Sequence, residues 1–251
     1  MYSVGDSVKV DDLKKLYWEE KLVEEYKKQE KDIRLKYNDY SDEYIEFYDN
    51  YLSALTSFAM TTIFYFDREK GELILNNSLS IVENIKKDEI KYYDKLSDIY
   101  FVLAGAYEHD EKYTKALEYY YKRLECNQKL VKLNRSEYLK GLADSYYRVA
   151  KLQRYHKLFD DAKKSFEIAL RLYEEILNEE KIDKNEVRIS LAECYYEVGV
   201  VEILLDKIEL TRDKVEPLFK KALELSREYI SGKVGRYNIM MFKSIFFNIA
   251  S

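Results

Sequence analysis

The chain has 251 residues and a formal net charge of −5, with 47% hydrophobic and 35% charged residues. This balance is typical of a folded, soluble protein and excludes intrinsic disorder. Acidic and basic residues are interleaved, and no basic block suited to a phosphate backbone appears, so we expect no nucleic-acid partner. One proline and seven glycines leave little room for hairpins or long loops and favour long helices.

The first predicted helix covers residues 11–37, where a narrow apolar stripe with a helical period runs through a highly charged segment. Ser41 caps a second helix, which has acidic residues in its first turn and ends near Phe66. A turn is predicted over Asp67–Gly71, and a third helix over residues 72–85. Seven further helices are predicted at about 88–108, 112–132, 136–155, 159–179, 183–206, 212–231 and 237–250.

Local signals mark several of the predicted helix starts. Asn134 with Glu137, and Asp183 with Glu186, have the spacing of a capping box. Pro217 is expected near the start of its helix, where a missing N–H costs little.

Three segments of the chain are similar to one another. LSDIYFVLA begins at Leu96, LADSYYRVA at Leu142 and LAECYYEVG at Leu191, at spacings of 46 and 49 residues. Each segment is followed, after a polar turn, by a second apolar helical pattern. Internal repeats of paired helices at this spacing predict an all-α stacked solenoid of about five antiparallel helix pairs and about ten helices.

The pairs resemble tetratricopeptide repeats (TPR), a family in which small residues of two helices face each other with aromatic residues between them. Three pairs match this order: Ala104, Tyr107, Tyr113, Ala116 and Tyr120; Ala150, Phe159, Ala162, Phe166 and Ala169; and, less closely, Gly199, Val215, Phe219 and Ala222. In a fourth pair, Ala59 takes the position of the small residue on the first helix. The repeat exceeds the family unit by about 12 residues, so these are elongated repeats.

The resemblance implies a right-handed superhelix, and the absence of a Pro-, Ser- or Gly-rich linker favours one continuous domain. Within it we expect a charged helix in residues 1–40 that packs on the solenoid, TPR-like repeats over 41–231, and an apolar helix in 232–251.

Groups that could carry out catalysis are few. The two histidines, His109 and His156, stand at predicted helix ends, and the two cysteines, Cys126 and Cys194, show no metal-binding or CxxC spacing. No glycine-rich phosphate loop is present. We therefore expect no enzyme, no cofactor and no metal site. The cysteine usage, the absence of a signal-peptide pattern and the absence of a membrane-spanning apolar run indicate a cytoplasmic protein.

The resemblance also implies where a partner would bind. In stacked pairs the first helices line the concave surface, and Phe101, Tyr147 and Tyr196 occupy one aligned position on them. Arg148, Lys151 and Arg154 follow the middle aromatic residue. Such a groove suits a peptide or helix with apolar and acidic residues. The alternative is that the aromatic residues pack neighbouring helices and that the basic residues form ordinary solvated surface.

The sequence therefore predicts a non-enzymatic protein–protein interaction module or scaffold that binds a peptide or partner protein in its concave groove. A bacterial peptide-sensing regulator of the TPR type is the alternative. The helix at 237–250 is apolar around nearly its whole circumference. It either inserts into the superhelix, contacts a partner or a second copy in a homodimer, or precedes further chain.

Overall fold

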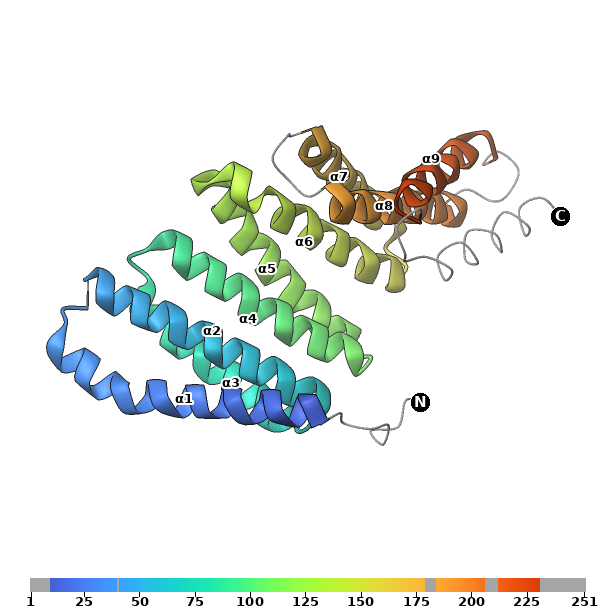
Figure 1. Cartoon of the computed structure of the whole chain (residues 1–251). Coiled ribbons are helices and arrows are strands. Elements are labelled where there is room, and N and C mark those ends of the chain that lie inside the picture. Colours follow the sequence, from blue (N-terminus) through green and yellow to red (C-terminus); the bar gives the residue numbers. More distant parts are fainter. Residues whose placement is uncertain (1–9, 40, 179–183, 206–211, 231–251) are drawn as a thin grey trace. The chain divides into compact units, whose positions relative to one another are not determined.

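The computed structural model describes residues 10–39, 41–178, 184–205 and 212–230 (Figure 1). This part of the chain contains nine α-helices and one 3₁₀ turn, which confirms the predicted all-α fold of sequential antiparallel pairs. The predicted helix at 237–250 and the cap at Asp183 lie outside the described residues. The elements are α1 (Val10–Lys36), α2 (Asp42–Tyr65), α3 (Arg68–Ile81), η1 (Val82–Ile85), α4 (Glu89–His109), α5 (Tyr113–Leu133), α6 (Arg135–Tyr155), α7 (Phe159–Asn178), α8 (Lys184–Leu205) and α9 (Arg212–Ile230).

The chain divides into two compact units, Met1–Leu133 and Asn134–Ser251. In the first unit, α2 pairs with α3 and α4 pairs with α5, while α1 packs along α2. In the second unit, α6 pairs with α7 and α8 pairs with α9. The division into residues 1–40, 41–231 and 232–251 stays a prediction.

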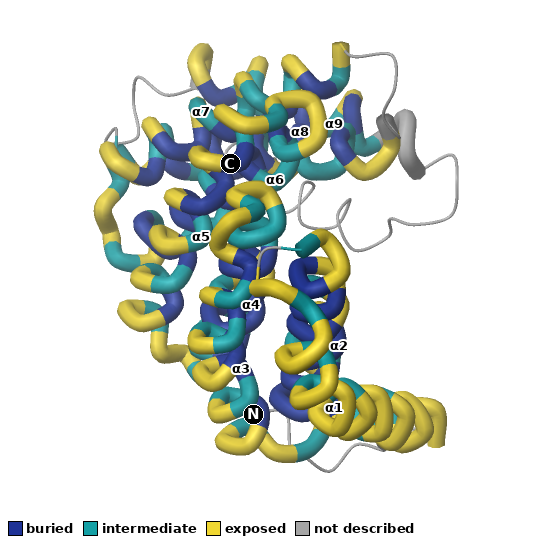
Figure 2. Tube along the Cα trace, turned by 90° about the vertical axis from the view of Figure 1, so that its left-hand side faces the viewer, coloured by how far each residue is buried: buried dark blue, intermediate teal, exposed yellow. Residues whose placement is uncertain are grey.

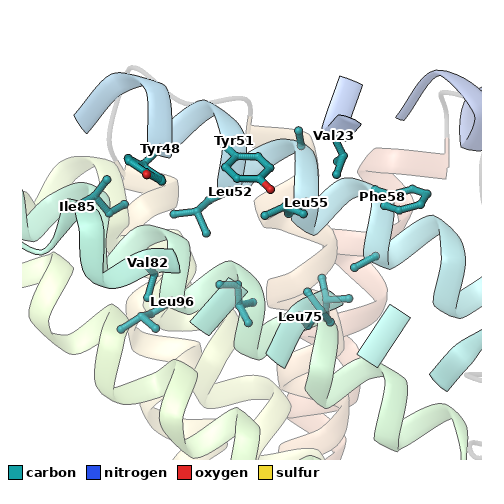
Figure 3. Packing of buried hydrophobic residues seen from close by; sticks show 14 of the residues in the cluster. Val23, Tyr48, Tyr51, Leu52, Leu55, Phe58, Leu75, Val82, Ile85 and Leu96 are labelled. Atoms are coloured by element: carbon teal, nitrogen blue, oxygen red, sulfur yellow. The ribbon is translucent and has the colours of Figure 1, made fainter. Parts of the chain in front are cut away.

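The core of the first unit is built mainly on α2. Tyr48, Tyr51 and Leu52 are almost completely buried there. Figure 3 shows the buried side chains of α2 between Val23 of α1 on one side and Leu75 and Val82 on the other. Removing each such side chain from water contributes about 1.5–3 kcal/mol to folding. The helix is therefore held by burial on two sides.

Tyrosine is used in this core because its ring and its hydroxyl serve different ends. The Tyr26 ring of α1 stacks on Tyr51 with centroids 5.4 Å apart. The Tyr48 hydroxyl, at the same interface, donates a hydrogen bond of 3.0 Å to Glu30 Oε1. A buried tyrosine thus packs as an apolar residue while its polar tip stays hydrogen-bonded.

Only one narrow side of α1 is buried. Val23 is its single buried residue among those described, and Figure 2 shows the rest of the helix exposed or half-buried. This arrangement agrees with the narrow apolar stripe in the sequence.

The predicted turn at Asp67–Gly71 is wrong in extent, because α3 already begins at Arg68. Asp67 caps it by accepting a hydrogen bond of 3.0 Å from the Lys70 backbone N–H. Gly71 lies inside the helix, where a Cβ atom would stand 2.4 Å from Ile63 Cγ1 and 2.9 Å from the Ala59 carbonyl oxygen. The glycine therefore allows α2 and α3 to pack closely and does not end the helix.

The small residues predicted from the repeats lie in the helix contacts. All of the matched alanines are fully buried: Ala59, Ala104, Ala116, Ala150, Ala162, Ala169 and Ala222. At Gly199 a Cβ atom would stand 2.8 Å from the Phe219 ring. Aromatic rings thus pack directly against the backbone or the methyl groups of the partner helix.

The turns inside the repeats α4/α5 and α6/α7 are built alike. Glu111 and Lys157, 46 residues apart, have φ angles of 59° and 61°. The residue after each donates a backbone hydrogen bond of 2.9 Å to a carbonyl five positions back. This is a Schellman motif, which usually places glycine at the left-handed position. The repeat therefore extends to the backbone conformation of its turns.

Two further predictions about helix starts are corrected. Asn134 stands at the N-cap of α6, but its side chain does not accept a hydrogen bond from the helix backbone as a capping box requires. Its amide instead donates a hydrogen bond of 2.7 Å to Glu137 Oε2. Pro217 lies inside α9, which begins at Arg212, so the proline cannot complete a hydrogen bond to the Asp213 carbonyl.

Candidate partner-binding site

The six predicted binding residues are divided between the two units. Phe101 lies on α4 in the first unit. The other five lie in the second unit, on α6 and α8: Tyr147, Arg148, Lys151, Arg154 and Tyr196.

Tyr147 connects three helices of the second unit. Its ring meets the edge of Phe166 on α7, with centroids 5.7 Å apart. Its hydroxyl donates a hydrogen bond of 3.1 Å to Glu193 Oε2 on α8. Burial raises the pKa of Tyr147, and the nearby carboxylates of Glu193 and Glu197 raise it further. Tyr147 is therefore a neutral donor that is half-buried between its neighbours.

Tyr196 has the same relationship to its own pair. Its ring lies 5.7 Å from Phe219 of α9, centroid to centroid, as Tyr147 lies beside Phe166. Both aromatic residues thus pack between the helices of their own pair, as the alternative interpretation of the sequence anticipated. Each is still partly exposed, and their role in binding stays a prediction.

The three predicted basic residues have different surroundings. The Lys151 Nζ atom lies 5.8 Å from the centre of the Tyr147 ring, within reach of a cation–π interaction. Arg154 Nε lies 3.0 Å from Glu197 Oε2 on α8. Arg148 forms no ion pair with the residues that the structure describes.

Glu197 is the buried partner of this basic group. It is 8% exposed, and burial raises its pKa, while the charges of Arg154 and Lys151 lower it. An ion pair with one buried member holds α6 and α8 in register, although desolvation cancels much of its attraction.

Sequence reasoning missed a carboxylate that recurs in each of the three repeats. Asp98, Asp144 and Glu193 occupy one aligned position of the three repeats, three residues before the aromatic residue. Asp144 accepts a hydrogen bond of 2.5 Å from the Tyr173 hydroxyl, and Lys140 Nζ lies 3.2 Å from it. Aligning the repeats by the charge of their side chains, as well as by their size, would have identified this acidic position.

Phe101 is placed differently from its counterparts. The Arg123 guanidinium of α5 lies 4.4 Å from the centre of its ring. The ring is 36% exposed.

The two thiols are buried, and the two imidazoles stand at helix ends. Cys126 and Cys194 are buried and unbonded to each other. Burial raises the pKa of Cys126 to about 12 and that of Cys194 well above its ordinary value, so both thiols stay protonated. His109 ends α4, and His156 caps α6. Among the described residues, no group of three His, Cys, Asp or Glu side chains could hold a metal ion.

The described helices differ from membrane-spanning helices in length or in polarity. None in this part of the chain is both long and apolar enough to cross a membrane.

Comparison with solved structures identifies the fold. The crystal structure of BtubC (BKLC) from P. vanneervenii is similar, with a TM-score of 0.65 and 18% identity, over 94% of this chain and 81% of that one. The chain folds as an all-α helical repeat like that of BtubC. The de novo designed helical repeat protein DHR64 also matches, at a TM-score of 0.32 and 16% identity, over 88% of this chain and 98% of that one. No protein-family model and no curated protein matches the sequence of this TPR-like repeat.

Proposed function

We propose that this TPR-like repeat is a non-enzymatic scaffold that binds a peptide or partner protein on the α6–α8 face. This face consists of Tyr147, Arg148 and Lys151 on α6, and Glu193 and Tyr196 on α8. The fold supports the proposal, because helical repeat proteins bind their partners through extended surfaces of side chains.

The observation that supports the proposal most is that the Arg148 side chain has no ion-pair partner among the described residues. It lies three residues before Lys151 on one side of α6, and it is partly exposed. The carboxylates of Glu193 and Glu197 are engaged by Tyr147 and Arg154, whereas Arg148 has no such partner in the described part of the chain. A cation beside a half-exposed ring is suited to an acidic residue next to an apolar one.

A peptide-display selection on the full chain tests this function. Peptides that bind the wild type are synthesised, and their dissociation constants are measured by fluorescence polarisation. Arg148→Glu should weaken the selected peptides by on the order of tenfold, since a favourable charge contact becomes a repulsive one. Circular dichroism should show unchanged helix content, because Arg148 pairs with no described residue.

The matched control is Lys164→Glu on α7. The Lys164 side chain is 74% exposed, and its ion pair with Asp161, at 3.8 Å, is one that solvent screens. The control makes the same change of charge away from the α6–α8 face, so it should leave affinity unchanged. If the two variants bind alike, or if no peptide is selected at all, the proposed function is wrong.

A further inference from the structure

The first unit has an exposed apolar surface of its own, which we name the α2–α4 face. It consists of Met60 and Phe64 on α2, and of Asp98, Phe101 and Gly105 on α4. Met60 is 37% exposed, Phe64 43% and Phe101 36%. These side chains are large, and they share one surface, whereas exposed apolar residues are more often scattered singly.

Gly105 makes a notch in this face. A Cβ atom at this position would meet only Phe64 Cζ, at 3.8 Å, with no other neighbour within 4 Å. Glycine is therefore not required here by a close helix contact, in contrast to Gly71. The space above its backbone is open and has the Phe64 ring beside it.

An acidic group lies at the other end of the same stripe of α4. Asp98, Phe101 and Gly105 are spaced by three and four residues, so they lie on one side of the helix. Asp98 occupies the aligned position of Asp144 and Glu193, both of which accept hydrogen bonds from tyrosine. Asp98 is exposed and forms no ion pair with the described residues.

The helix α2 differs from α6 at the position that bonds the next carboxylate. Tyr147 of α6 bonds Glu193 of the next first helix, and the alignment of Ala59 with Ala104 places Thr56 at the corresponding position of α2. The buried Thr56 hydroxyl makes no hydrogen bond in the described structure. The chain thus has a threonine on α2 where α6 has the tyrosine that bonds Glu193.

Two cations, Lys95 and Arg123, act on Asp98, and each also contacts another group. Lys95 Nζ lies 3.3 Å from Asp49 and 3.9 Å from Asp94, and its side chain is 11% exposed. Arg123 lies over the Phe101 ring. Burial raises the pKa of Asp98, while the charges of Lys95 and Arg123 lower it, although neither cation forms an ion pair with it. The three carboxylates Asp49, Asp94 and Asp98 outnumber these two cations.

We propose that the α2–α4 face is a docking site for an amphipathic helix of a partner protein, with a basic residue and a bulky apolar residue seven positions apart. Asp98 and Gly105 are seven residues apart, or about 10 Å along α4. Residues seven apart lie on one side of a helix, so a partner helix along α4 repeats this distance. Its basic residue meets Asp98, and its apolar residue enters the notch at Gly105. The inference rests on the proposed scaffold function and adds the chemistry of a partner.

Two labelled peptides test the site on the full chain. Both are helical 18-residue peptides with a leucine on the apolar side, and they differ only in a lysine or a glutamate seven residues before it. Fluorescence polarisation should show the lysine peptide binding the wild type on the order of tenfold more tightly than the glutamate peptide. Asp98→Lys should reverse this preference, and Gly105→Leu should weaken the lysine peptide on the order of tenfold by filling the notch.

Leu73→Ala is the control, because Leu73 is an exposed residue of α3 in the same unit and lies outside the α2–α4 face. It should leave both affinities unchanged. Equal affinity for the two peptides, no binding of either, or full affinity in Gly105→Leu overturns the inference. The Arg148→Glu variant separates this result from the function proposed above, since it should weaken the displayed peptides and leave the lysine peptide unaffected.

Discussion

The Tyr147 hydroxyl donates a hydrogen bond of 3.1 Å to Glu193, and this bond joins α6 to α8, the first helices of successive pairs. The same tyrosine ring packs on Phe166 within its own pair. One residue thus contributes both to the contact within a pair and to the contact between pairs. The two contributions can be separated by substitution.

Tyr147→Phe removes only the hydroxyl and should lower the free energy of unfolding by about 1 kcal/mol. Tyr147→Ala also removes the ring and should cost about 3 kcal/mol or more. Urea unfolding of both variants measures the difference. If Tyr147→Ala costs no more than Tyr147→Phe, the ring is not part of the packing between α6 and α7.

Glu197 should make stability depend on pH in a defined direction. Burial raises its pKa above 4.5 in the folded chain, so the folded state binds a proton more readily than the unfolded state does. The contribution of Glu197 to stability is therefore greatest in acid and is lost as pH rises from about 4.5 through the raised pKa. Glu197→Gln removes this titration.

The difference in unfolding free energy between Glu197→Gln and the wild type should accordingly change in favour of the variant as pH increases. Urea unfolding at a series of pH values from about 4 to 8 measures it. A difference that is constant over this range would show that the folded structure leaves the pKa of Glu197 unchanged.

Gly71 and Gly105 should respond oppositely to the same substitution. Gly71→Ala places a methyl group against the Ala59 carbonyl and Ile63, and it should destabilise the chain by about 1–3 kcal/mol despite the better helix propensity of alanine. Gly105→Ala meets only Phe64 at an ordinary contact distance, and it should be neutral or stabilise by up to about 1 kcal/mol. Thermal unfolding of both variants measures the effects, and equal effects would contradict the packing of α2 on α3.

The two Schellman turns offer a further pair of substitutions. Glu111→Gly and Lys157→Gly should each stabilise the chain by about 0.5–1 kcal/mol, since the left-handed conformation strains residues other than glycine. Lys164→Gly, in the interior of α7, should instead destabilise by about 1 kcal/mol. Chemical denaturation compares the stability of the three variants. A loss of stability in Glu111→Gly or Lys157→Gly would contradict the left-handed conformation of that residue in its turn.

The helices were largely predictable from the sequence because their apolar positions recur with a helical period. The six helices from α4 to α9 begin and end within about two residues of the predicted bounds. The start of α3 was not predictable in the same way. Gly71 is needed by the backbone of α2, a neighbour that the local sequence does not show.

The candidate site was predictable only in part. The repeat alignment identified Tyr147 and Tyr196, but the pairing of Arg154 with Glu197 depends on how α8 lies beside α6. The roles of Asp98 and Gly105 likewise depend on what α2 places next to them. Repeats predict which residues are equivalent, and packing between the helices decides how equivalent residues differ.

The central claim is that the α6–α8 face contacts a bound polypeptide, and site-specific photo-crosslinking tests it most directly. Cys126 and Cys194 are buried, and their raised pKa values keep them unreactive, so a cysteine introduced by Arg148→Cys can be labelled selectively with a maleimide photo-crosslinker. A selected peptide should crosslink to this position and not to Lys164→Cys labelled in the same way. Equal crosslinking at both positions, or none at Arg148→Cys, would contradict the account.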